Sequence, residues 1–289
     1  MTTIARIGWP KKLAVRLRTA CTTKLLPLLL LLFALSASGQ STPNASVKAS
    51  GSGSASSASK DKPFVNNLGM KFAPVPGTKV LFSVWDVRVR DYEAYAAASA
   101  GVDNSWKTPG FEQGPTHPVV KVSWDDAEAF CEWLTKQERQ AGLISENQSY
   151  RLPTDAEWSM AVGLAEEGGG TPSDKNMKIK EVYPWGNEWP PPSGAGNYDP
   201  SLNVDNYVST SPVGSFKANR YGLYDMGGNV WQWCEDFYDN QSGSRVLRGA
   251  SWSYYYPDYV LSSYRGTYAP GKRQSHVGFR CALVVGSSP

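Results

Sequence analysis

Three cysteines and two histidines lie beyond residue 100, and these residue types have the most versatile chemistry in the sequence. They are Cys131, Cys234, Cys281, His117 and His276. No two of the cysteines form a CxxC pair and the histidines are widely separated, so the spacing typical of a zinc site is absent. In an oxidising compartment such thiols form disulfides instead. The simplest interpretation is one disulfide and one spare thiol.

A second distinctive group is a run of tyrosines near residue 260, mixed with basic residues. Tyrosine offers a large contact area and loses little rotamer entropy on binding, so this composition is typical of a recognition surface. Some of the rings are needed in the core, but six tyrosines beside basic groups exceed what packing requires. We therefore expect a ligand-binding face. Its predicted residues are Trp252, Tyr254, Tyr255, Tyr256, Tyr259, Arg265 and His276, with Tyr264, Tyr268, Lys272 and Arg273 close to them in sequence.

The elements that position these residues are signalled most strongly in the first half of the chain. Residues 123–126 (SWDD) and 154–157 (TDAE) each form a capping box, in which a hydroxyl and a carboxylate satisfy free amides at a helix start. Each box precedes an apolar stripe, so two helices are predicted there. A strand is expected at 80–84 and a short helix at 91–100.

From residue 184 onward the helix signals vanish. The chain contains 11 Trp, 15 Tyr, 27 Gly and 20 Pro, which describes an aromatic, turn-rich globular protein rather than a helical bundle. The roughly 90 residues after 184 are too aromatic to be disordered and too poor in regular strands to form a sandwich. Bound cations and a disulfide are therefore expected to order this region.

The N-terminal residues predict export. Residues 1–39 have a basic start, an apolar run at 25–37 and small residues at the end, so we expect a signal peptide cleaved near Gln40 and a periplasmic or extracellular protein. The alternative is an uncleaved anchor, but the run is shorter than the roughly 20 residues of a spanning helix. No stable membrane span is expected after cleavage. Residues 40–62, rich in Ser, Ala and Gly, are predicted to be a linker.

The charge pattern argues against nucleic-acid partners. The formal charge is +3. Six of the basic residues precede residue 25, so the mature protein is close to neutral or slightly acidic. With no basic run in the globular part, the electrostatic footprint of a nucleic-acid-binding protein is missing.

A series of short motifs runs in order through the C-terminal two thirds. The motifs occupy 117–120 (HPVV) with 123–124 (SW), 150–154 (YRLPT) with 157–158 (EW), 183–187 (YPWGN), 211–214 (SPVG), 221–226 (YGLYDM), 228–231 (GNVW), 245–249 (RVLRG), 251–252 (SW) and 278–281 (GFRC). This series closely resembles the formylglycine-generating enzyme, or sulfatase-modifying factor, family, over about 220 residues. The resemblance implies one α+β domain at 63–286 with an irregular C-type-lectin-like fold, made of two main helices, small antiparallel sheets and much ordered loop.

The resemblance also implies a chemistry that this sequence cannot support. Active family members convert a cysteine of an unfolded sulfatase segment into formylglycine, with oxygen and a copper(I) ion held by two cysteines. Those positions lie three and eight residues after Ser251 and are Tyr254 and Tyr259 here, so although Ser251 is kept, the catalytic set is not intact. Phenols are hard oxygen ligands that ionise near pH 10, whereas copper(I) prefers thiolates. Copper is therefore not expected.

By resemblance, Cys131 pairs with Cys281, and Cys234 is left as a small buried apolar residue. The family also holds calcium in two loops through oxygen ligands. The first site implied here combines Asn197 and Asp205 with the carbonyls of Tyr198 and Tyr207, and the second combines Asp225 and Gln232 with the carbonyls of Gly228 and Val230. Gln232 replaces the usual Glu, which removes a charge and weakens the second site. Alternatively these Asn and Asp residues only form Asx-turns.

Three functional hypotheses follow. The first is a non-catalytic exported module that binds a peptide, protein or glycan. The second is an enzyme with an altered site, in the extreme case an active formylglycine-generating oxidase. The third is a structural partner of a cell-surface protein. Loss of both thiolate positions favours the first over the second.

Overall fold

The computed structural model describes residues 54–164 and 167–286. The predicted signal peptide at 1–39 and the first part of the predicted linker lie outside them. The α-helices are α1 (Val89–Ala98), α2 (Trp124–Gln140), α3 (Asp155–Val162) and α4 (Pro172–Lys175), and the 3-10 helices are η1 (Ala55–Ser57), η2 (Ser105–Lys107), η3 (Pro200–Leu202) and η4 (Pro257–Val260). No helix in these two ranges has the length and apolar character needed to cross a membrane.

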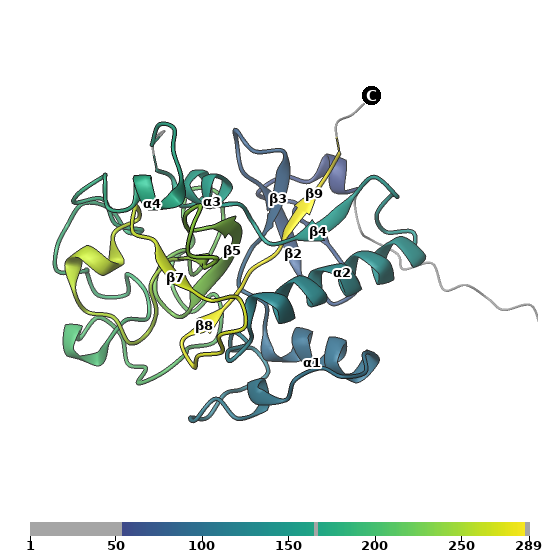
Figure 1. The fold of residues 1–289 in the computed structure, drawn as a ribbon, viewed down its shortest axis with the longest axis horizontal. Coiled ribbons are helices and arrows are strands. Elements are labelled where there is room, and N and C mark those ends of the chain that lie inside the picture. Colours follow the sequence, from purple (N-terminus) through teal and green to yellow (C-terminus); the bar gives the residue numbers. More distant parts are fainter. Residues whose placement is uncertain (1–53, 165–166, 287–289) are drawn as a thin grey trace, which may run out of the picture. The chain divides into compact units, whose positions relative to one another are not determined.

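The first sheet joins the two ends of the domain. Its strands are β1 (Phe64–Val65), β2 (Lys71–Pro74), β3 (Val80–Ser83), β4 (Ser149–Arg151) and β9 (Ala282–Val284). They lie in the order β1-β2-β3-β9-β4, and every neighbouring pair is antiparallel. Helix α2 packs against β4 and against α1 (Figure 1). The last strand is thus enclosed between two strands that lie far earlier in the chain.

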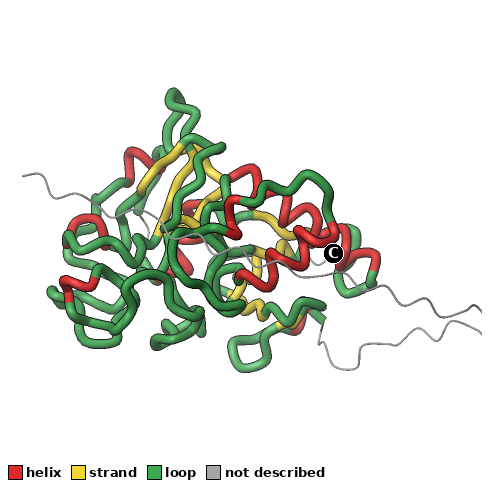
Figure 2. The backbone as a smooth tube through the Cα atoms, turned by 90° about the horizontal axis from the view of Figure 1, so that it is seen from below, coloured by secondary structure: helices red, strands yellow, loops and turns green. Residues whose placement is uncertain are grey.

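The second sheet positions the C-terminal tyrosines. Its strands are β5 (Trp231–Phe237), β6 (Arg245–Arg248), β7 (Gly266–Tyr268) and β8 (Val277–Gly278), in the order β7-β6-β5-β8. The pair β5 and β8 is parallel and the other two pairs are antiparallel. Long loops connect these strands, as the green tube in Figure 2 shows. The expected α+β fold with small sheets and much loop is confirmed.

Both predicted capping boxes are present. Ser123 Oγ accepts a hydrogen bond from Asp126 N at 3.1 Å, and Asp126 Oδ2 accepts one from Ser123 N at 2.8 Å. Thr154 and Glu157 make the same exchange at 3.1 and 2.9 Å. Helix α3 then ends at Gly163, whose φ of 92° suits a glycine cap. The helix expected at 91–100 begins two residues earlier.

The second sheet was not predicted, and its sequence explains why. The first four residues of β5 are all buried, so they lack the apolar-polar alternation of a half-exposed strand. Strands β7 and β8 have only three and two residues. Such short strands form because they pair with neighbouring strands, so the local sequence does not predict them.

The C-terminal part of the predicted linker, residues 54–62, belongs to the described residues. Residues 54–62 already pack on the domain, since Ala55 is buried in the main core and Ser54 accepts a hydrogen bond from Ser56 N at 3.3 Å. The side chain of Lys60 lies against Gly222. Most of this segment is exposed, and Ala55 is its one buried residue.

Candidate functional site

The segment after β6 is held tightly by the loop that precedes β5. Gly228 N donates a hydrogen bond to Gly249 O at 2.8 Å, and Trp252 N donates one to Asn229 O at 3.0 Å. Ala250 adopts a left-handed φ of 62°, which turns the chain at this point. Ser251 is fully buried, and its Oγ lies 3.2 Å from Ser253 Oγ.

The tyrosines predicted to bind a ligand do come together. Tyr254, Tyr256, Tyr259 and Tyr264 pack edge to face, with the ring centroids of Tyr254 and Tyr259 at 6.2 Å and those of Tyr259 and Tyr264 at 5.2 Å. Tyr255 donates a hydrogen bond from its hydroxyl to that of Tyr256 at 3.0 Å. We call these five residues the tyrosine face.

Three members of the face are presented to solvent. The exposed fractions are 42% for Tyr255, 53% for Tyr256 and 41% for Tyr259. Helix η4, which begins with Pro257, turns the chain between Tyr256 and Tyr259. Large aromatic side chains are seldom left exposed side by side without a partner, so the face has the character of a binding surface.

A cavity of about 290 Å³ adjoins the face. Its lining is largely aromatic: Asn176, Trp231, Tyr238, Leu247, Tyr254, Tyr264, Arg265, Gly266, Thr267 and Tyr268. Burial raises the pKa of Tyr254 and raises that of Tyr264 to about 12, so both phenols are neutral at physiological pH. They therefore offer hydroxyl groups that both donate and accept hydrogen bonds.

His276 and Trp252 lie close to this cavity. His276 Nε2 is 3.4 Å from the Tyr268 hydroxyl, and burial lowers the pKa of the imidazole, which favours its neutral form. Trp252 donates a long hydrogen bond of 3.4 Å to Ser275 O and packs edge to face against Phe111. Neither adds charge to the site.

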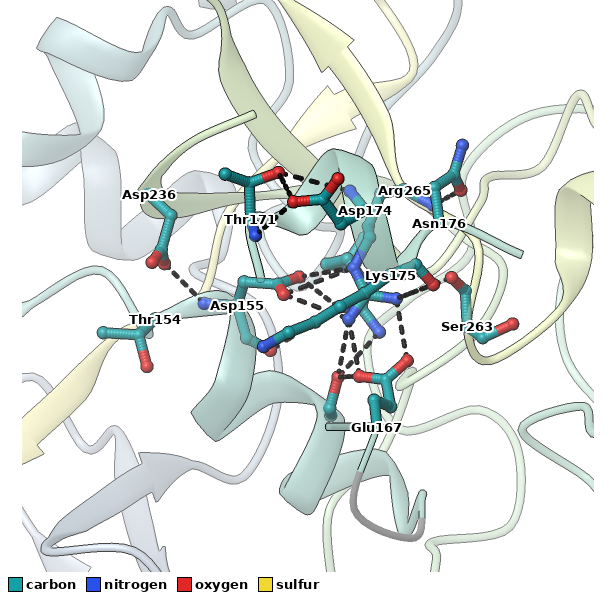
Figure 3. A network of polar contacts seen from close by, with 12 residues as sticks. Thr154, Asp155, Glu167, Thr171, Asp174, Lys175, Asn176, Asp236, Ser263 and Arg265 are labelled. Atoms are coloured by element: carbon teal, nitrogen blue, oxygen red, sulfur yellow. Dashed lines mark hydrogen bonds and ion pairs between the residues drawn. The ribbon is translucent and has the colours of Figure 1, made fainter. Parts of the chain in front are cut away.

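Arg265 does not belong to an exposed recognition face, contrary to expectation. Its side chain is fully buried, and Figure 3 shows its guanidinium held between Asp155 and Glu167. Nitrogen-to-oxygen distances are 3.0 Å to Asp155 and 2.5 Å to Glu167, and Arg248 pairs with the same Asp155. Although burial opposes ionisation, these two arginines hold the pKa of Asp155 below its usual value. Arg265 therefore lines the cavity as a buried, ion-paired residue.

A second basic residue close to the face in sequence is also engaged elsewhere. Arg273 forms two hydrogen bonds of 2.8 Å with Asp126, at the start of α2. Asp258 of η4, between Tyr256 and Tyr259, also forms an ion pair, with Lys180 at 3.5 Å, so these charges beside the tyrosine face are paired. Sequence reasoning missed cavity residues such as Trp231 and Asn176, although Trp231 ends one of the recognised motifs and Asn176 Oδ1 accepts a hydrogen bond from Arg265 N at 2.8 Å.

Comparisons with known proteins settle the family. Residues 59–285 match the sulfatase-modifying factor enzyme 1-like domain. The formylglycine-generating enzyme of Thermomonospora curvata is 32% identical over 242 residues, which cover 72% of this chain and 68% of that protein. The chain belongs to this family. The bovine inactive C-alpha-formylglycine-generating enzyme 2 is 33% identical over 201 residues, covering 64% of this chain and 58% of that protein.

A solved structure supports the fold independently. PvdO from Pseudomonas aeruginosa superposes with a TM-score of 0.51 over 71% of this chain and 80% of that one, at 24% identity. At that identity the likeness concerns the architecture alone.

The family's copper chemistry does not fit this site. In the described ranges no thiol lies on the tyrosine face: Cys131 and Cys281 belong to one core cluster and Cys234 to the other, and all three are buried. At the positions where the sequence resemblance places the family's thiolates, the phenols of Tyr254 and Tyr259 pack against each other. Two neutral phenols do not form the soft, two-sulfur site that copper(I) requires.

The predicted disulfide partners lie side by side. Cys131 Sγ on α2 and Cys281 Sγ just before β9 are 3.7 Å apart as two unbonded thiols, and burial raises the pKa of Cys131. Cys234 lies in the other cluster, where burial also raises its pKa. The pairing of Cys131 with Cys281 stays a prediction.

The residues of the first calcium site fit an oxygen-coordinated cation. Asn197 is fully buried, and its Oδ1 has no hydrogen-bond partner while its Nδ2 donates to Ser209 O at 2.8 Å. The Asp205 carboxylate accepts from Tyr198 N and Tyr207 N at 3.0 and 2.8 Å and keeps further lone pairs. A buried carbonyl oxygen without a donor is costly unless a cation or water meets it.

The second set of residues is arranged differently. Gln232 is fully buried, and its Oε1 accepts hydrogen bonds from Trp158 Nε1 at 2.7 Å and from Arg280 Nε at 2.8 Å. Its Nε2 donates to the backbone oxygen of Asp225 at 2.6 Å. The Asp225 carboxylate accepts from Gly214 N at 2.8 Å. This geometry does not fit a ligand role for Gln232.

Proposed function

We propose that this protein is a non-catalytic member of the sulfatase-modifying factor family that binds a peptide, protein or glycan segment at the tyrosine face and its cavity. The observation that carries the proposal is the occupation of both thiolate positions by Tyr254 and Tyr259, packed edge to face. A pocket without thiolates cannot hold copper(I) together with a substrate thiol. The name of the bovine relative, an inactive enzyme, is in keeping with loss of activity in this family.

The chemistry of the site favours an uncharged ligand segment. Aromatic rings provide apolar contact area, and neutral phenols provide hydrogen bonds at their edges. Arg265 and Arg273 are occupied by ion pairs, so neither is free to recognise a carboxylate or phosphate. We also propose that the protein is exported, because of its predicted signal peptide, and that it carries calcium at Asn197 and Asp205.

The first test concerns catalysis. The full chain is incubated aerobically with copper and a sulfatase peptide containing the substrate cysteine, and the peptide is analysed by mass spectrometry. We expect no formylglycine, with the Thermomonospora curvata enzyme as the positive control. Conversion that depends on oxygen and copper would overturn the proposal and restore the oxidase hypothesis.

The second test concerns binding. Arrays of peptides and glycans are probed with the natural protein, with Tyr256→Ala plus Tyr259→Ala, and with Met160→Ala as a matched control. Met160 is a comparably exposed apolar residue on α3. We expect the double variant to lose whatever binding the natural protein shows and the control to retain it. Equal binding by all three proteins would contradict a role for the tyrosine face.

A further inference from the structure

We infer that the second calcium position of the family is filled in this chain by the protein's own side chains, chiefly Arg280 and Gln232, so that the domain holds no cation there. The expected total of one calcium ion rests on the proposed calcium site at Asn197. The inference about the second position itself rests on the contacts of Gln232.

The amide of Gln232 has no acceptor capacity left for a metal ion. An amide oxygen has two lone pairs, and both are used by Trp158 Nε1 and Arg280 Nε. The amide nitrogen donates to Asp225 O, which fixes the orientation of the group. Turning the oxygen toward the Asp225 carboxylate would leave two fully buried donors, Trp158 Nε1 and Arg280 Nε, without their acceptor, which is unfavourable in the interior.

Arg280 supplies a fixed positive charge where the family has a calcium ion nearby. Its guanidinium is fully buried and donates to the backbone oxygens of Tyr224 and Asp225 at 2.8 and 3.2 Å and to Ser83 O at 3.0 Å. It also pairs with Asp86 at 3.4 Å. A divalent cation close to this group would be repelled, because both carry positive charge and charges are poorly screened in the interior.

The loop itself is held without an ion. Asp225, Gly228 and Asn229 have left-handed φ values of 53°, 77° and 59°, a turn that needs external support. Direct hydrogen bonds provide that support: Asn229 N donates to Asn197 O at 2.8 Å, and Asn229 Oδ1 accepts from Ser211 N at 3.0 Å. The amide oxygens expected to be ligands differ between the two sites, because Asn197 Oδ1 has no donor whereas Gln232 Oε1 has two.

The experiment counts calcium ions on the full chain. Isothermal titration and elemental analysis are applied to the natural protein and to Asp205→Asn, Asp225→Asn and Gln232→Ala, with circular dichroism to confirm folding. We expect one ion in the natural protein, none in Asp205→Asn, and one in each of the other two. Gln232→Ala keeps the Asp225 carboxylate but loses the hydrogen bond to the Asp225 backbone oxygen, so the ion count of the natural protein decides the matter if neither variant folds.

Two results would overturn the inference: two ions in the natural protein, or a lower count caused by Asp225→Asn or Gln232→Ala in a folded protein. A count of zero in the natural protein and in every variant has a different meaning. It would contradict the calcium proposed at Asn197 and support the ion-free arrangement at Gln232, so the two failures are distinguishable.

Discussion

Residues 64–162 and residues 184–280 are held in place by different kinds of contact. In the first region, apolar side chains such as Phe130 and Leu134 on α2 pack beneath a regular sheet. In the second, single polar side chains bind backbone groups of their own turn and of distant elements. Asn219 Oδ1 accepts hydrogen bonds from Tyr221 N and Leu223 N, and Asn219 Nδ2 donates to Ala161 O. Packing in the first region depends on the volume of apolar side chains, whereas the loops of the second region depend on specific hydrogen-bonding atoms.

The largest expected effect comes from the buried ion pairs beneath the tyrosine face. Asp155→Ala leaves Arg248 and part of Arg265 buried without their shared carboxylate, and we expect a loss of about 3–5 kcal/mol in the free energy of unfolding. Urea denaturation measures it. Asp258→Ala, which breaks an exposed pair with Lys180, is the control and should cost at most about 1 kcal/mol. Similar losses in both variants would erase the contrast.

A pair of substitutions of similar size tests the comparison directly. Leu134→Met keeps apolar volume in the first region and should cost less than about 1.5 kcal/mol. Asn229→Leu in the second region should cost about 3 kcal/mol, because the amide and carbonyl of Ser211 lose their partner and leucine tolerates the left-handed φ poorly. Thermal unfolding of both variants gives the answer. The comparison fails if the leucine variant is the more stable.

A buried carboxylate in the first region predicts a pH effect. Burial raises the pKa of Glu138 on α2 to about 7, opposed only by a hydrogen bond from Asn67 N. The folded protein therefore binds more protons than the unfolded chain between about pH 4.5 and 7, and stability falls as the pH rises through this range. Glu138→Gln should stabilise the protein by about 2 kcal/mol at pH 8 and by much less at pH 5. Parallel stability curves for the two proteins would refute this.

Removal of calcium should loosen the second region by a smaller amount. With free calcium at ten times its dissociation constant, binding at Asn197 and Asp205 would stabilise the protein by about 1.4 kcal/mol. A chelator should therefore lower the melting temperature of the natural protein and leave that of Asp205→Asn unchanged. An identical melting temperature with and without chelator would count against calcium at this loop.

The smallest effect on stability is expected at the tyrosine face itself. Tyr256→Ala removes an exposed ring and should change the free energy of unfolding by no more than about 0.5 kcal/mol. Denaturation in urea measures it, with Tyr264→Ala as a comparison, because that ring packs against Trp231 and should cost more. A large loss in Tyr256→Ala would mean that the face serves the core rather than a ligand.

Sequence reasoning succeeded where the determining contacts are local. The capping boxes at 123–126 and 154–157 need only four residues each, so α2 and α3 were predictable. The tyrosine face also followed from composition, because five of its rings lie within eleven consecutive residues.

It failed where the determining contacts are distant. Arg265 was placed on the surface, whereas its partners Asp155 and Glu167 are 110 and 98 residues away in sequence. Strand β5 was missed because its start is buried on both faces. The hydrogen bonds of Gln232 join residues 74 and 48 positions apart, so its residue type alone did not indicate how it is used.

The place of β9 has a consequence for biosynthesis. Residues 282–284 fill the slot between β3 and β4, which lie some 130 or more residues earlier in the chain. Until the ribosome has delivered them, the inner edges of both earlier strands have no hydrogen-bonding neighbour. The first sheet can therefore be completed only after residues 282–284 have been synthesised. A nascent chain that stops before residue 282 would expose two strand edges with unpaired backbone groups, which chaperones can bind.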